Sequence, residues 1–314
     1  MQRRHLITAA AALATASAVL PARAQSRTSI VYGYTAVSDF ASVFVAAEEG
    51  FFAKRGLDVE LKFIPINSAI PAAIQSDSLH IGGPTPTVFV QAIDGGLDHV
   101  VLAGGGVLSK TYTDLAVMAR AGSGIRAAQD FVGKKVGVPG LGALLHVTFR
   151  QWLKTQGVDH RKVTFIEAPF PQHADLIRGG SIDAVVTAGP FMARILDSST
   201  GYVASFYTTF LPEGLPTIVH AAKRDWARAN PDAVKSFTKA VQEGAAFMLQ
   251  PQNDAKLRAA LAKYLRLPPP AVAKMQISPP GPVVNEKQLS AWIQIMNEQE
   301  MLKTAPVAVS LLAK

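Results

Sequence analysis

The polar side chains best placed to bind a small molecule lie where a strand ends and a helix is expected to begin. Thr85 and Thr87 follow Gly83, and their hydroxyls could hold an anion at the N-terminus of the next helix or simply cap that helix. The same two interpretations apply to Asn67 and Ser68, which precede another short helix. These residue types predict recognition by hydrogen bonding.

Two histidines lie at the start of expected helices, and each could have a functional or a purely structural role. His146 is in the first turn of its helix, where it could contact a ligand, cap the helix or pack against it. His173 follows Gln172 at a later helix start, and the two could donate hydrogen bonds to a carboxylate or lie in a solvated loop. The first-ranked polar candidates are Thr85, Asn67, Ser68 and His146.

The chain carries no recognisable catalytic or metal-binding motif. It lacks H-E-x-x-H, G-x-S-x-G and a phosphate loop, and its 7 His residues form no i, i+4 pair. Without Cys, disulfides, thiolate nucleophiles and cysteine metal sites are excluded. The glycines at 104–106 lack the spacing of a dinucleotide site and are interpreted as a turn. We therefore expect no catalytic residues, no metal and no cofactor.

The composition is that of a globular protein of about two domains, with 314 residues, 49% of them hydrophobic and 17% charged. The formal net charge is +8. Because lysines and arginines occur as scattered singles and pairs, no basic stripe is present and a nucleic-acid partner is not expected.

Residues 1–24 are typical of a cleaved export signal. Arg3 and Arg4 precede an apolar run at 6–20, and Ala22-Arg23-Ala24 provides the small residues that a signal peptidase reads. The paired arginines favour the twin-arginine route over general secretion. The apolar run is shorter than the roughly 20 residues of a membrane-spanning helix, and no later stretch is long and apolar enough. We expect a periplasmic mature protein with no membrane anchor.

The mature sequence alternates short strands with helices of the matching hydrophobic period. Strands are expected at 29–34, 58–63, 79–82, 100–103, 114–119, 135–138, 163–167, 182–187 and 218–221. Helices are expected from an N-cap at Ser38, and at 69–75, 85–93, 144–156, 172–178, 231–250, 254–264 and 285–302. This order predicts two α/β domains with parallel sheets, in which ligands bind beyond the carboxyl ends of the strands. The loops at those ends are 35–38, 65–68, 83–87, 139–144, 169–173 and 188–191.

The stretch 50–60 reads Gly-Phe-Phe-Ala-Lys-Arg-Gly-Leu-Asp-Val-Glu. It resembles the opening of periplasmic solute-binding proteins of the nitrate, sulfonate, taurine and thiamine-precursor ABC transporter family. Further similarities, which together cover most of 29–200, are at 31–35, 45–49, 79–82, 133–138 and 176–186. The resemblance implies a type II periplasmic binding protein fold: two α/β lobes joined by a two-stranded hinge, with a ligand closed between them.

The resemblance also implies a function and a set of partners. We expect the extracytoplasmic solute-binding subunit of an ABC importer, a monomer that captures a ligand by hinge closure and docks on a permease and an ATPase. No enzyme activity is expected. The expected divisions are a signal peptide at 1–24, the first part of lobe 1 at 25–117, lobe 2 at 118–214 and the return to lobe 1 at 215–314.

Two departures from the family pattern bear on the ligand. Residues 139–146 read Pro-Gly-Leu-Gly-Ala-Leu-Leu-His, without the hydroxyl residues usual before this His, and Ala-Gly-Pro at 188–190 stands where the family often has Trp-Glu-Pro. The cleft should therefore be larger and more apolar at these two loops. We accordingly expect a small organic anion rather than an inorganic oxyanion. The predicted ligand-binding residues are Tyr34, Thr35, Ser38, Phe40, Asn67, Ser68, Gly83, Thr85, Thr87, Leu141, His146, Gln172, His173, Gly189, Phe191 and Tyr207.

Two other functions stay open. Biosynthetic enzymes related to this family, including thiamine-pyrimidine synthases and menaquinone-pathway lyases, share the architecture. They are generally cytoplasmic, and the synthases carry a cysteine-rich motif that this chain lacks, so the export signal favours a binding protein. A protein that presents its ligand to a sensor kinase is the other alternative.

Overall fold

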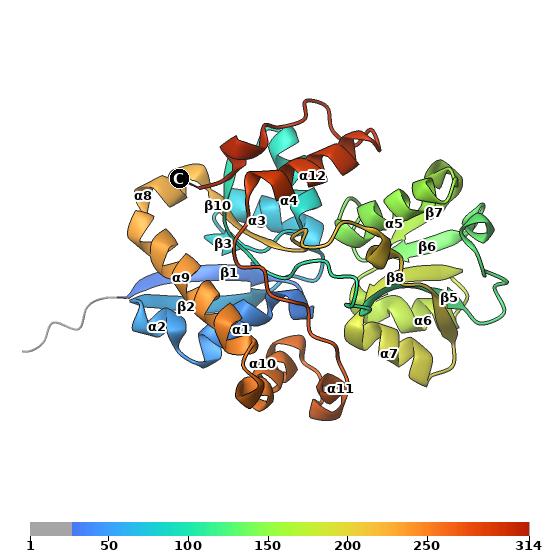
Figure 1. Cartoon of the computed structure of the whole chain (residues 1–314), viewed down its shortest axis with the longest axis horizontal. Helices are drawn as coiled ribbons and strands as arrows, with labels where there is room; N and C mark the ends of the chain where they lie inside the picture. Colours follow the sequence, from blue (N-terminus) through green and yellow to red (C-terminus); the bar gives the residue numbers. More distant parts are fainter. Residues whose placement is uncertain (1–26, 314) are drawn as a thin grey trace, which may run out of the picture.

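Two five-stranded sheets form the framework of the computed structural model, which describes residues 27–313 (Figure 1). The first sheet has the order β2-β1-β3-β10-β4 and consists of β1 (Thr28–Tyr34), β2 (Leu57–Phe63), β3 (Ile81–Gly82), β4 (His99–Gly104) and β10 (Val219–Lys223). The second has the order β7-β6-β8-β5-β9 and consists of β5 (Leu115–Arg120), β6 (Lys135–Val138), β7 (Thr164–Glu167), β8 (Ala184–Ala188) and β9 (Gly201–Ser205). The expected signal peptide lies outside the described residues.

Helices cover both faces of each sheet. They are α1 (Ala41–Glu48), α2 (Phe51–Lys54), α3 (Ile70–Gln75), α4 (Pro86–Asp94), α5 (Leu144–Thr155), α6 (His173–Arg178), α7 (Gly189–Asp197), α8 (Arg224–Ala229), α9 (Pro231–Met248), α10 (Asp254–Leu265), α11 (Pro269–Ala273) and α12 (Glu286–Asn297). Figure 1 shows α3, α4 and α12 on one side of the first sheet and α1, α2 and α9 on the other, whereas α5 lies opposite α6 and α7 in the second. Within residues 27–313, no helix has the length and apolarity needed to cross a bilayer.

Each sheet is mixed rather than purely parallel. β1 runs parallel to β2 and β3, and β6 runs parallel to β7 and β8. β10 is antiparallel to β3 and β4 because the chain returns to the first sheet from the second. β5 is likewise antiparallel to β8 and β9. The connecting strand expected at 114–119 is thus present as β5, and it lies inside the second sheet.

The two sheets are joined by a short antiparallel ribbon, the hinge, formed by residues 105–108 and 214–218. The Gly105 N–H donates to the Ile218 carbonyl at 3.0 Å, and the Thr217 N–H donates to the Gly106 carbonyl at 2.8 Å. Residues 278–282 add a third segment, since the Val107 N–H donates to the Pro279 carbonyl at 2.9 Å. The two-stranded hinge of the predicted fold is thus present, with a C-terminal segment against it.

The glycine run at 104–106 is extended, so its interpretation as a turn was wrong. Gly104 ends β4, and Gly106 forms an antiparallel bridge with Pro280 of the segment packed against the hinge. A Cβ at Gly106 would lie 2.2 Å from the Ser278 Oγ and 2.8 Å from the Asp39 Oδ1. Glycine is needed here because other chain segments pack directly against the backbone.

β9 and α12 depart from the expected elements. β9 was not predicted because its five residues are only half-buried at the edge of the sheet and show no clear alternation. α12 begins with the predicted capping box at Asn285 and Gln288. It ends at Asn297, short of the expected residue 302, and residues 298–302 turn toward α5.

Candidate functional site

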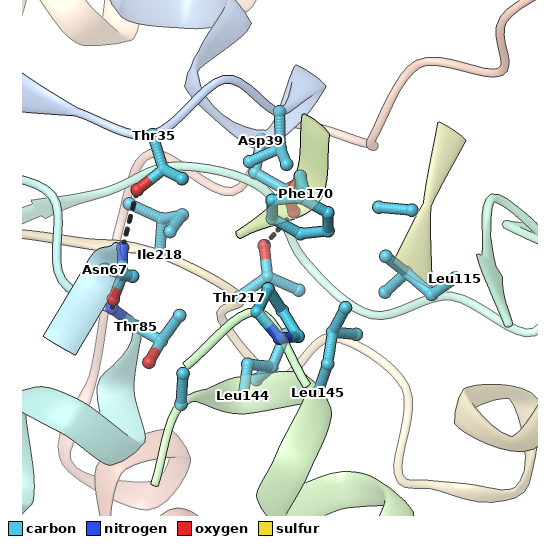
Figure 2. A pocket seen from close by; sticks show the side chains of 14 residues that line it. Thr35, Asp39, Asn67, Thr85, Leu115, Leu144, Leu145, Phe170, Thr217 and Ile218 are labelled. Atoms are coloured by element: carbon cyan, nitrogen blue, oxygen red, sulfur yellow. Dashed lines mark hydrogen bonds between the residues drawn. The ribbon is translucent and has the colours of Figure 1, made fainter. Parts of the chain in front are cut away.

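A cavity lies between the two sheets, at the edge where the parallel strands end. Its empty space is about 490 Å³, including the open mouth. Every one of the six predicted loops contributes to it. The lining residues are Thr35, Val37, Asp39, Asn67, Thr85, Leu115, Pro139, Ala143, Leu144, Leu145, Phe170, Ala188, Thr217 and Ile218 (Figure 2).

The wall from the first sheet is built around Asn67. Its Nδ2 donates to the Thr35 Oγ1 at 3.1 Å and to the Gly83 carbonyl at 3.0 Å, and its Oδ1 accepts from the Thr85 N–H at 2.7 Å. Asn67 is 6% exposed, so these bonds are shielded from water. Its amide donors are fully used, and Asn67 therefore acts mainly by fixing three loops around the cavity.

Replacing Asn67 with Ala is expected to lower the free energy of unfolding by about 1.5–2 kcal/mol, because three buried partner groups on two neighbouring loops lose their hydrogen bonds. Urea denaturation of the full mature chain measures this effect. Exposed Asn297→Ala, at the end of α12, is the control and should cost far less. Equal stability of the two variants would contradict the role assigned to Asn67.

Thr85 caps α4, which is one of the two roles predicted for it from the sequence. Its side chain accepts from the Val88 N–H at 3.4 Å, and its hydroxyl lies 3.1 Å from that of Thr87. Thr85 also lines the cavity, whereas Thr87 is fully buried and does not. Ser38 caps no helix, since the residue before its 3-10 turn is Val37. Its hydroxyl accepts from the Ser278 N–H at 3.2 Å and lies 3.1 Å from the Tyr112 hydroxyl.

The wall from the second sheet is apolar. It consists of Leu115, Pro139, Ala143, Leu144, Leu145, Phe170 and Ala188. Phe170 stacks on Phe191, with ring centroids 5.1 Å apart, so Phe191 supports the wall from behind. No Lys, Arg or His of residues 27–313 lines the cavity.

The two candidate histidines are buried and do not line the cavity. His146 Nδ1 accepts from the Gly142 N–H at 2.9 Å, and its ring packs edge-on against Phe165. Burial, helped by the nearby Arg150 charge, lowers the pKa of His146 to about 3, so its ring is neutral. Both nitrogens of His173 are bonded, to the Thr187 hydroxyl at 2.9 Å and the Ala168 carbonyl at 2.8 Å. His173 therefore fixes the wall internally.

The other predicted residues lie outside the lining. Tyr34 and Phe40 are in the aromatic core of the first sheet, and Tyr207 is in that of the second, where its hydroxyl donates to the Leu145 carbonyl at 3.1 Å. Gly83 carries the carbonyl that Asn67 binds. The remaining ones lie near the cleft without lining it: Ser68, Leu141, Gln172 and Gly189.

Sequence reasoning missed the one charged residue of the lining, Asp39, together with Thr217. The Thr217 hydroxyl donates to Asp39 Oδ1, drawn as a dashed line in Figure 2. The Ser278 hydroxyl donates to the same oxygen at 3.1 Å. Burial raises the pKa of Asp39, and these two hydroxyls partly oppose the rise. A carboxylate in the lining and no cation is the opposite of what an anionic ligand requires.

The sequence profile of the family described as NMT1/THI5 like matches residues 37–255. The chain belongs to the NMT1/THI5-like family. The matched segment includes the second sheet, every strand of the first sheet except β1, and the loops around the cavity from residue 37 onward. The predicted family resemblance is confirmed.

Two relatives of this NMT1/THI5-like chain are named as solute-binding proteins. The nitrate/nitrite binding protein NrtA of Synechococcus elongatus is 28% identical over 254 residues, which is 71% of this chain and 56% of that protein. The chain thus spans about half the length of this relative. The bicarbonate-binding protein CmpA of the same species is 25% identical over 269 residues, 75% of this chain and 56% of that protein.

A solved structure supports the fold at low sequence identity. The alkanesulfonate-binding protein SsuA from Xanthomonas axonopodis pv. citri, bound to MOPS, superposes with a TM-score of 0.75 at 16% identity. The superposition covers 91% of this chain and 98% of that one. The type II periplasmic binding protein fold is therefore confirmed.

Proposed function

We propose that this protein is the extracytoplasmic solute-binding subunit of an ABC importer, which captures a small organic ligand between its two lobes and delivers it to a permease and an ATPase. The observation that carries the proposal is a cavity lined from both sheets and placed beside the hinge that joins them. Export by the signal at residues 1–24 and action as a monomer belong to the same proposal.

The proposed lobes follow the sheets. Lobe 1 is formed by the chain up to Gly104 and from residue 219 onward, and lobe 2 lies between the hinge segments, from β5 to η6 (Tyr207–Phe210). β5 begins at Leu115, so we place the crossing into lobe 2 a few residues before the expected division at 117.

Two side-chain hydrogen bonds between the lobes stabilise the closed form. On one side of the cavity, the Gln91 Nε2 of α4 donates to the Gly142 carbonyl at 2.9 Å. Farther away, the Gln299 Nε2 donates to the Val147 carbonyl of α5 at 3.1 Å. Ligand contacts made by both walls would add to these bonds and raise the closed population.

Replacing Gln91 with Ala is expected to weaken ligand affinity about 3- to 10-fold, because one interlobe hydrogen bond of the closed form is lost. The loss should come mostly from faster release, which stopped-flow fluorescence measures. Gln242→Ala, on α9 and away from the cavity lining, is the matched control. Unchanged release from the Gln91 variant would contradict the assigned role of this contact.

The function is tested by a thermal-shift screen of residues 25–314 against nitrate, bicarbonate, sulfonates, carboxylates, amines and pyrimidines. A ligand at about 100 times its dissociation constant should add roughly 2.7 kcal/mol to the free energy of unfolding. Recovery of the compound unchanged, together with ligand-dependent binding to an ABC permease, is the expected result. A compound recovered transformed would instead support an enzyme.

A further inference from the structure

Two buried carboxyl groups lie together at the hinge side of the cavity without a positive partner. Asp39 lines the cavity and is 6% exposed, and Asp114 is 8% exposed. Neither forms an ion pair with any Lys, Arg or His of residues 27–313. Taking a carboxylate out of water without a counter-charge is costly, so such a group is poised to accept a cation.

Asp39 is held rigidly, with bonding capacity to spare. The Thr217 and Ser278 hydroxyls both donate to its Oδ1, and the Asp39 backbone N–H also bonds the carboxyl. A carboxylate has about four lone-pair sites, so it can accept from a further donor. Thr217 belongs to the hinge and Ser278 to the segment packed against it. The carboxylate is therefore oriented by the same backbone that joins the two sheets.

Asp114 adds a second negative charge behind the lining. Its Oδ2 is buried and has no hydrogen-bond partner. Burial raises the pKa of Asp114 to about 6, helped by the charge of Asp39 and opposed by the Gln276 backbone N–H. Tyr112 faces both carboxyls, and burial together with their charges raises the pKa of its hydroxyl. With a pKa near 6, the Asp114 carboxyl is mostly ionised at neutral pH.

The rest of the lining suits an organic skeleton. Phe170 offers an aromatic ring, and an ammonium or amidinium group is attracted to such a face when it is shielded from water. The second wall has no oxygen-bearing side chain. Calcium needs six or more oxygen ligands and magnesium near-octahedral oxygen coordination, which an apolar wall does not provide.

We propose that the ligand carries a positively charged nitrogen, as an ammonium or amidinium group on an apolar skeleton, whose N–H donates to Asp39 with the charge of Asp114 behind it. This inference rests on the proposed solute-binding function and specifies its substrate class. It replaces the organic anion expected from the sequence.

Calorimetric titration of residues 25–314 at neutral pH with matched probes tests the proposal. The probes are benzylamine and benzamidine, with benzoate and benzenesulfonate as anionic counterparts and calcium chloride alone. The two cations should bind at least about tenfold more tightly than the anions, and Asp39→Asn should weaken their binding at least about tenfold, which corresponds to about 1.4 kcal/mol. The control is Asp58→Asn, which also removes one negative charge. Asp58 is exposed and lies near the start of β2, at the end away from the cavity, so this variant should bind the probes as the unmodified chain does.

Asparagine keeps the oxygen that accepts from Thr217 and Ser278, and circular dichroism establishes that the Asp39 variant is folded. Tighter binding of the anions, binding of calcium alone, or equal amine binding by both variants would overturn the cationic assignment while leaving a solute-binding protein. Failure of every probe also counts against the assignment, whereas the proposed function fails only if the wider screen yields no ligand.

Discussion

Replacing Ala188 with Phe is expected to weaken ligand binding more than 100-fold while the chain stays folded. Ala188 ends β8, lines the cavity and is 4% exposed. A phenyl ring there would occupy space that the ligand needs and would meet the opposite wall on closure. A loss above 100-fold corresponds to more than about 2.7 kcal/mol of binding free energy. Calorimetric titration with the compound that most stabilises the unmodified chain measures it.

The control for this blocking variant is Ala188→Ser, which changes the same position with little added volume and should bind within about threefold of the unmodified chain. Far-ultraviolet circular dichroism and the unfolding midpoint separate a filled cavity from a disrupted sheet. Undiminished binding by a folded Ala188→Phe protein would show that the ligand lies elsewhere.

Replacing Asp114 with Asn is expected to raise the free energy of unfolding at neutral pH by about 2–3 kcal/mol. The pKa of Asp114 is raised from 3.8 to about 6, mainly by burial, so ionising it costs the folded state roughly this amount. Asparagine keeps the oxygen that accepts from the Gln276 N–H but carries no charge. The binding site therefore holds a charge that reduces stability.

The stability gained by Asp114→Asn should depend on pH, because it comes from removing a charge that only the ionised carboxyl carries. Well below pH 3.8 the carboxyl is protonated in both folded and unfolded chains, so the variant should have no advantage there. The advantage should grow as the pH rises toward 6 and then stay constant. Urea denaturation at several pH values measures it, with exposed Asp58→Asn as the control. A variant less stable than the unmodified chain at neutral pH would refute the cost assigned to Asp114.

The position of the cavity could be predicted from the sequence because it follows from strand order. Parallel strands end at one edge of a sheet, so the loops after β1, β2, β3, β6, β7 and β8 had to come together. Thr35, Asn67 and Thr85 were found in this way and line the cavity.

The chemistry of the cavity could not be predicted in the same way. Asp39 lies in the turn after β1, where an acid next to Ser38 is typical of a helix start. Its hydroxyl partners, Thr217 and Ser278, are 178 and 239 residues away, and no local pattern connects them. Tyr34 and Phe40 were misplaced because an aromatic residue at helical or strand spacing fits a core as well as a binding wall.

The most direct test of the account is the distance between the lobes with and without ligand. Because the chain has no Cys, Lys62→Cys in β2 and Lys162→Cys in η4 (His160–Lys162), before β7, place one fluorescent label at an exposed position on each lobe. Saturating ligand is predicted to shorten the distance and narrow its distribution, and Ala188→Phe should remove this response. A ligand that binds tightly and leaves the distance unchanged would contradict closure about the hinge.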